Sequence, residues 1–201
     1  MFISLSSKYS GYACGIAHAI KGMNAVQDKR TLFFDWVLCT MESITQIVID
    51  DTEIEFDYEM NLGPAHFVPF RNTNLIVSAH DFTSESKSDP ATRQRVKETY
   101  VRRKERFLDR VQETPSDLYF FRFVQKKEEL ELEHLLRFHA FITSLRKDRR
   151  FTIVIITIDA TLSGSSFPSN IVVEHCTPPI PYYDYDVIRE WYGTILQKFI
   201  T

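Results

Sequence analysis

Apolar stretches rich in β-branched and aromatic residues recur along the chain and predict buried strands. Four of them are candidates for a single core sheet: residues 2–6, 75–79, 118–124 and 151–158. The last two (LYFFRFV and FTIVIITI) show little polar alternation, a pattern typical of strands that helices cover on both faces. We therefore expect these four strands to pair mainly in parallel, and a further strand is predicted over 170–174.

Segments with apolar residues at helical spacing lie between these strands. They predict helices over 13–23, 41–49, 93–113 and 128–145, and a last helix that Asp184 caps and that ends at Phe199. Residues 32–38 (LFFDWVL) read as a strand, with a loop at Asp35 as the alternative. Alternating strands and helices predict a three-layer α/β/α domain with a mainly parallel central sheet.

One segment, at about residues 50–72, departs from this alternation. From Glu42 to Glu59, both included, there are seven acidic residues and no basic one, and Asn61, Gly63, Pro64 and Pro69 follow. Such a composition predicts a solvated, irregular insertion. We expect a single α/β domain over residues 1–201 that carries this acidic insertion.

The composition bounds the class of protein. A chain of 201 residues, 44% of them hydrophobic, can build its core without disulfides or a structural metal. Its three cysteines have no regular spacing, so we expect reduced thiols. The first residues lack a signal-peptide pattern, and the longest apolar stretch is far shorter than a membrane span. We therefore expect a cytoplasmic protein that does not bind membranes.

The charge balance is close to neutral. With 24 basic and 27 acidic residues the net charge is -3, which argues against nucleic acid as a partner. Only the predicted helix over 93–113 is basic, with eight basic and four acidic residues, and we expect its surface arginines to be solvated.

Several polar residues fall near predicted strand ends, where parallel sheets bind their ligands. They are Ser6, Cys14, Asp35, His80, Asp81, Arg122 and Asp159. Cys14 is expected at a helix start, where unpaired N–H groups lower a thiol pKa below about 8.5 and favour a nucleophile. The alternative is a small buried side chain without a chemical role. His18, four residues on, lies on the same helical face, so it is either a contact of the thiol or a core histidine, and the core histidine is the more common case.

His80 follows an apolar strand and is our candidate general base, with a loop histidine that caps local backbone as the alternative. Arg122 lies within an aromatic strand and needs a partner, either a structural carboxylate such as Asp35 or an anionic group of a substrate. We predict that Asp35, His80 and Arg122 share one cleft. Because neither a phosphate-binding glycine loop nor a set of metal ligands is found, we expect no cofactor and no metal.

An ordered series of short motifs runs from residue 1 to about residue 160. It comprises ISLS, Cys14-x-x-Ala17-x-x-Ile20, FFDWV, HDF, YVRRKERF and LYFFRF. The series resembles an uncharacterised family described as papain-like cysteine peptidases, with Ser6 at the position of that family's glycine. The resemblance implies Cys14 as the nucleophile, His80 as the base and Asp35 or Asp81 as the acid that orients the base. Unlike papain, however, this chain predicts a parallel sheet.

Two classes of function follow. In the first, a cysteine-dependent hydrolase or transferase acts on an acyl or amide bond. In the second, a domain without hydrolytic activity binds a phosphate or carboxylate ligand through arginines at the strand ends. For either, a peptide, a glycan or a small anionic molecule is the expected substrate or ligand, and Ser6, Trp36, Arg103 and Arg122 are the candidate binding residues.

Overall fold

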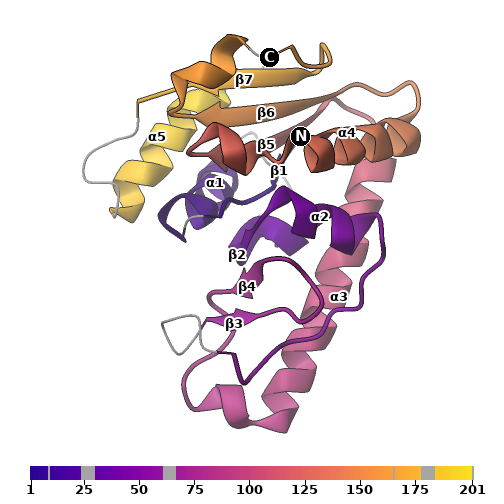
Figure 1. Cartoon of the computed structure of the whole chain (residues 1–201), viewed down its shortest axis with the longest axis vertical. Helices are drawn as coiled ribbons and strands as arrows, with labels where there is room; N and C mark the ends of the chain where they lie inside the picture. Colours follow the sequence, from indigo (N-terminus) through magenta and orange to yellow (C-terminus); the bar gives the residue numbers. More distant parts are fainter. Residues whose placement is uncertain (9, 24–29, 61–66, 165, 178–183, 201) are drawn as a thin grey trace.

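The structure is a computed structural model that describes residues 1–8, 10–23, 30–60, 67–164, 166–177 and 184–200. Its helices are α1 (Ser10–Gly22), α2 (Met41–Val48), α3 (Pro90–Glu113), α4 (Leu132–Arg146) and α5 (Tyr185–Gln197). Its strands are β1 (Phe2–Ser4), β2 (Val37–Cys39), β3 (Val68–Pro69), β4 (Ile76–Ser78), β5 (Leu118–Val124), β6 (Phe151–Thr157) and β7 (Ile171–His175). Figure 1 shows the helices around one larger sheet, with a smaller sheet beside it.

The larger sheet has the order β1-β5-β6-β7, and all of its pairs are parallel. Alternate residues of β5 face opposite sides: Phe121 packs with apolar residues of α1 and α5, whereas Phe120 packs with those of α2, α3 and α4. The predicted three-layer α/β/α architecture with a mainly parallel sheet is therefore confirmed. The predicted strand at 170–174 is also present, as β7.

The prediction that residues 75–79 join this sheet is wrong. They form β4, the middle strand of a second sheet with the order β2-β4-β3, and both of its pairs are antiparallel. The chain between β3 and β4 is only a short turn, closed where the Phe70 N–H donates to the carbonyl of Ile76. Such a connection is too short for a parallel crossover, so the two strands must run in opposite directions.

Residues 32–38 combine both predicted alternatives. A 3₁₀ helix over Phe33–Trp36 comes first, and β2 follows directly. The Asp35 carboxylate accepts a hydrogen bond from the Leu32 N–H at 2.9 Å, which closes this turn. The polar residue that interrupts the apolar run therefore has a local structural cause.

Residues 50–60 of the acidic segment contain no helix or strand, but the segment is not simply solvated. Ile54, Phe56, Val68 and Phe70 are buried, and they belong to the larger hydrophobic core. The ring of Phe56 lies 4.5 Å from that of Phe70, centroid to centroid. The segment is thus anchored by its apolar positions, which alternate with the acidic ones.

The acidic side chains of this segment meet the basic helix α3. Lys97 lies 3.0 Å from Glu53, and Lys104 forms an ion pair with Asp51. The prediction that the surface arginines of this helix are solvated is only partly right: Arg102 is exposed, but Arg103 lies 3.3 Å from Asp81 and Arg106 donates to the Thr31 carbonyl at 2.6 Å. In the described part of the chain, no helix combines the length and the apolar character needed to cross a lipid bilayer.

We expect Phe56→Ala to lower the free energy of unfolding by about 3–5 kcal/mol, because Phe56 is only 4% exposed and its loss leaves a cavity. Urea denaturation followed by circular dichroism measures this change. Met60→Ala is the matched control, since Met60 is 48% exposed in the same segment and should change stability by less than about 0.5 kcal/mol. Equal effects of the two changes would contradict an anchored segment.

Candidate active site

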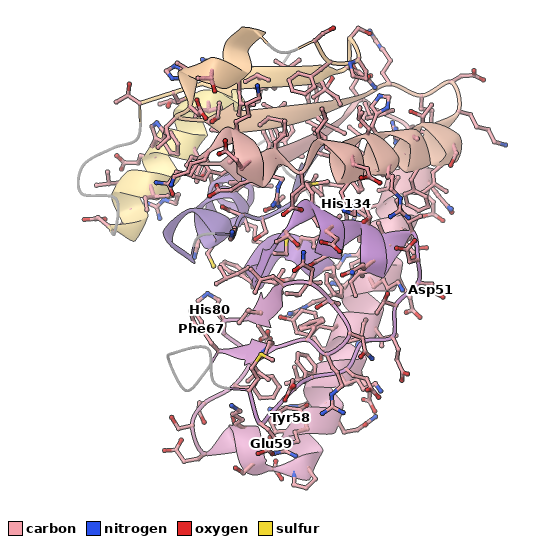
Figure 2. The ribbon with its side chains drawn as sticks, viewed as in Figure 1. Asp51, Tyr58, Glu59, Phe67, His80 and His134 are labelled. Carbon is pink, nitrogen blue, oxygen red and sulfur yellow. The ribbon has the colours of Figure 1, made fainter. Side chains whose placement is uncertain are left out.

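The sulfur of Cys14 lies 3.1 Å from Nε2 of His80, which is within hydrogen-bond distance. Cys14 belongs to α1, which packs on the parallel sheet, whereas His80 follows the end of β4 in the antiparallel sheet. Figure 2 labels His80 beyond the end of β4. The two residues are 66 positions apart in the sequence, so only the fold brings them together.

The environment of the Cys14 thiol differs from the expected one. Cys14 is the fifth residue of α1, one turn inside the helix, so the free N–H groups of the first turn do not surround its sulfur. Its side chain is 2% exposed. Burial, and secondly the nearby charge of Asp35, raise the pKa of Cys14 to about 12. The prediction of a lowered thiol pKa is therefore wrong, and the resting thiol is protonated.

Asp81, the residue after His80, receives three side-chain hydrogen bonds. Ser78 donates to it at 2.8 Å, the Tyr100 hydroxyl at 2.5 Å and the Arg103 guanidinium at 3.3 Å. Burial raises the pKa of Tyr100 well above its usual value, so its hydroxyl keeps the proton that it donates. These bonds tie the main chain beside His80 to α3.

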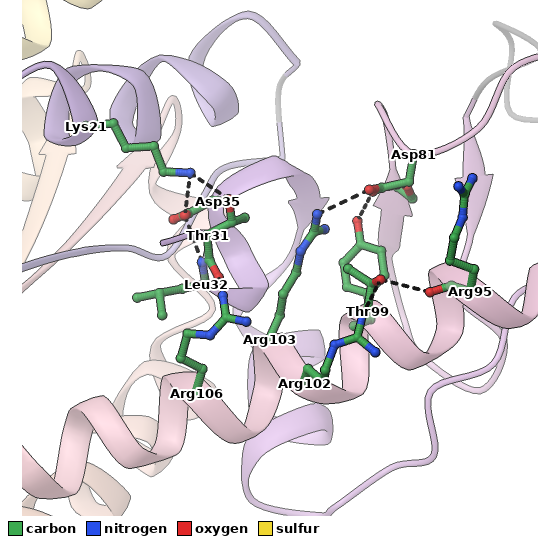
Figure 3. Close-up of polar contacts among 12 residues, drawn as sticks. Lys21, Thr31, Leu32, Asp35, Asp81, Arg95, Thr99, Arg102, Arg103 and Arg106 are labelled. Atoms are coloured by element: carbon green, nitrogen blue, oxygen red, sulfur yellow. Dashed lines mark hydrogen bonds and ion pairs between the residues drawn. The ribbon is translucent and has the colours of Figure 1, made fainter. Parts of the chain in front are cut away.

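The Asp35 side chain is buried and has its own polar partners. Its carboxylate lies 3.1 Å from the Lys21 amine, which also donates to the Thr31 hydroxyl at 3.0 Å (Figure 3). Burial raises the pKa of Asp35, although the charge of Lys21 and the hydrogen bond from the Leu32 N–H oppose that shift. Asp35 thus places a buried acid near the thiol, with a lysine as its partner.

Trp36 contributes an aromatic side chain next to the Cys14–His80 pair. Its ring lies 5.7 Å from the His80 ring and 4.9 Å from the His18 ring, edge to face in both cases. The amine of Lys21 lies 4.7 Å from the centre of the Trp36 ring. His18 is exposed at the surface, so the prediction of a core histidine is wrong.

Arg103 extends from α3 between Asp35 and Asp81 (Figure 3). Its guanidinium lies 4.8 Å from the centre of the Tyr100 ring and binds Asp81 through Nη2. Its other terminal nitrogen, Nη1, is buried and has no hydrogen-bond partner among the described residues.

Ser6 and Arg122 do not line this site. Ser6 is fully buried, and its hydroxyl donates to the carbonyl of Val37. Arg122 is 1% exposed and donates to the carbonyls of Leu5 and Cys39, both at 3.0 Å. The prediction that Arg122 shares a cleft with Asp35 and His80 is therefore wrong, and main-chain carbonyls replace the anionic partner that we expected for it.

Ser6 adopts an unusual backbone conformation. Its φ is 61°, in the left-handed region that favours glycine.

Sequence reasoning missed two polar residues of the site, Lys21 and Tyr100. Lys21 lies seven residues after Cys14 on α1, a spacing of two helical turns that places both on one face. Tyr100 precedes Arg103 by three residues on α3, where it has the spacing of the buried apolar residues Val96, Phe107 and Val111. Among the described residues, no three His, Cys, Asp or Glu side chains form a group that could hold a metal ion.

The chain matches a family model. A family model described as "Putative papain-like cysteine peptidase (DUF1796)" matches residues 64–161, which confirms the resemblance suggested by the motifs. The matched stretch contains His80, Asp81, Arg103 and Arg122, whereas Cys14 and Asp35 lie before it. No curated protein and no solved structure matches the chain. At a coarse level the match supports a cysteine hydrolase.

We expect alkylation of Cys14 by iodoacetamide to rise about tenfold per pH unit from pH 7 to 9 without a plateau, because a thiol with a pKa of about 12 stays protonated throughout. The negative charge of Asp35 raises that pKa, so Asp35→Asn should lower it and speed labelling by about three- to tenfold. Mass spectrometry of the labelled peptides measures both effects.

Cys39 and Cys176 serve as internal references in this experiment, because Cys39 is fully buried and reports any general opening of the chain. Asp159→Asn is the control substitution, since Asp159 contacts Lys127 and Thr161 instead of the site. A plateau below pH 8 in the native protein would contradict a protonated resting thiol.

Proposed function

We propose that the protein is a cysteine-dependent hydrolase or transferase that acts on an acyl or amide bond, with Cys14 as the nucleophile and His80 as the general base. The observation that carries this proposal is the 3.1 Å contact between the Cys14 sulfur and His80 Nε2. A nucleophile within hydrogen-bond reach of a base is the minimal arrangement for nucleophilic catalysis. The match to a family described as cysteine peptidases supports the same class of reaction.

The first half of the reaction follows from the protonated thiol. As the sulfur attacks the substrate carbonyl carbon, its proton moves to Nε2 of His80, and a tetrahedral intermediate forms. The intermediate collapses when the imidazolium gives this proton to the departing amine or alcohol. A thioester on Cys14 remains, and His80 is neutral again.

The second half releases the acyl group. His80 takes a proton from water, or from another acceptor hydroxyl or amine, as that molecule attacks the thioester. The thiolate of Cys14 leaves and recovers its proton from His80. Water as the acceptor gives hydrolysis and another nucleophile gives transfer, so the two outcomes share one mechanism.

The positions of the other residues support defined parts in this reaction. Asp81 acts as a positioning residue, because its bonds to Ser78, Tyr100 and Arg103 fix the main chain next to His80. Trp36 packs beside the His80 ring and limits its movement. The anion-binding alternative invoked Arg122 and its neighbouring arginines. Arg122 has main-chain carbonyls as partners, so this alternative would now depend on Arg103, whose Nη2 already binds Asp81.

A panel of peptidyl acyloxymethyl ketones, which alkylate catalytic cysteines, tests the proposal. We expect a covalent adduct on Cys14, detected by intact mass and peptide mapping. His80→Gln should slow its formation by about 100-fold or more, since general-base assistance contributes at least that much. Cys14→Ala should abolish it.

Cys176→Ala is the matched control, because Cys176 is a free thiol outside the site and its loss should leave the adduct unchanged. Labelling that is equally fast in His80→Gln, or that falls on Cys176 instead of Cys14, would refute the proposed pair.

A further inference from the structure

The two proposed reactive residues stand on different sheets. Cys14 lies on α1, which begins just after β1 leaves the parallel sheet, and His80 lies two residues after Ser78 at the end of β4. Their 3.1 Å separation therefore depends on how the two sheets are joined.

The sheets meet along a seam between residues 5–7 and β2. Ser7 forms a parallel bridge with Leu38, and the Cys39 N–H donates to the Ser7 carbonyl at 3.0 Å. The Ser6 hydroxyl donates to the carbonyl of Val37, the residue at the start of β2. These contacts join residues 5–7 to β2 directly and involve no third element.

Arg122 holds this seam from a third element. It projects from β5, and its Nη1 donates to the Leu5 carbonyl while its Nη2 donates to the Cys39 carbonyl, both at 3.0 Å. Nη1 also lies 4.0 Å from the Cys39 sulfur, and that thiol in turn donates to the Leu5 carbonyl. One guanidinium thus links the end of β1 and the end of β2 to the centre of the parallel sheet.

Movement at this seam would reach both reactive residues. Leu5 precedes α1 and hence Cys14 in the chain. On the other side, β2 pairs with β4, with Val37 opposite Ser78, two residues before His80. A shift of β2 relative to Leu5 therefore changes the distance between the thiol and the imidazole.

We propose that Arg122 is a positioning residue that sets the separation of Cys14 and His80, an inference that rests on the function proposed above. A guanidinium suits this task because its planar fork reaches two carbonyls at once in fixed geometry. A lysine amine is a compact charge on a flexible stem, so Arg122→Lys keeps the charge but not the two-point link.

A double-mutant cycle between Arg122→Lys and His80→Gln tests the inference, with the rate of Cys14 labelling by the acyloxymethyl ketone as the readout. We expect Arg122→Lys alone to slow labelling by about tenfold or more. In that background His80→Gln should add less than about threefold, because the imidazole no longer reaches the sulfur.

The chain offers a matched control in Arg146. This arginine is 2% exposed and donates to the carbonyls of Val111, Thr114, Ser116 and Arg150, at the amino ends of β5 and β6. Arg146→Lys replaces another buried guanidinium with an amine, so it should lower thermal stability as Arg122→Lys does. In the Arg146→Lys background, His80→Gln should still slow Cys14 labelling by its full factor.

The outcomes separate the two proposals. If His80→Gln has no effect in the native background, the proposed function fails. If it has its full effect in both the native and the Arg122→Lys backgrounds, the function stands and the positioning role is overturned. Loss of the effect in Arg146→Lys as well would reduce Arg122 to a general stabiliser. Should Arg122→Lys not fold, Arg122→Ala with millimolar guanidinium replaces it, and restored labelling supports the role while unrestored labelling of a folded protein contradicts it.

Discussion

A buried guanidinium with main-chain carbonyls as partners lies where the two sheets meet, and the surrounding chain is arranged around its hydrogen bonds. An uncompensated buried charge costs several kcal/mol, whereas each hydrogen bond from a charged donor contributes about 1.5–3 kcal/mol. Arg122 therefore requires the carbonyls of Leu5 and Cys39 to point at it. The Leu5 N–H donates to the Phe121 carbonyl, so Leu5 still pairs with β5 through its N–H. Its carbonyl, however, binds Arg122. Ser6 then turns into the left-handed region, and the chain leaves the sheet towards β2 and α1.

Charge complementarity organises the other half of the molecule. From the sequence alone, the acidic segment before β3 and the arginines of the basic helix α3 are expected to be solvated. In the structure they largely face each other, through Lys97 with Glu53 and Lys104 with Asp51, while Phe56 anchors the segment underneath. Exposed pairs of this kind contribute little stability, at most about 1 kcal/mol each. Their effect is mainly to fix which face of α3 covers the segment, and this leaves Tyr100 and Arg103 turned towards Asp81.

The sequence pattern predicted the long elements well. Burial on both faces makes β5 and β6 almost continuously apolar. Burial of one face gives α3 and α5 apolar residues with a period of 3.6. It misplaced β4, since a three-residue apolar strand has the same composition in a parallel or an antiparallel sheet, and only its partners decide between them. Asp35, His80 and Asp81 were identified as candidates for the site. The true partners of Asp35 and Arg122 were not, because a lysine on another helix and two main-chain carbonyls have no pattern along the chain.

The protonation state of Cys14 links these features to the proposed chemistry. Burial raises the pKa of Cys14 to about 12, which disfavours the stable thiolate–imidazolium ion pair that many cysteine enzymes use. The proton must then leave during the attack itself, and its transfer to His80 is efficient only while the sulfur and Nε2 stay within hydrogen-bond distance. This requirement makes the alignment of the two sheets part of the proposed mechanism. Burial also restricts oxidation, which follows thiolate character and exposure, so the environment that raises the pKa of Cys14 also protects its thiol from oxidation.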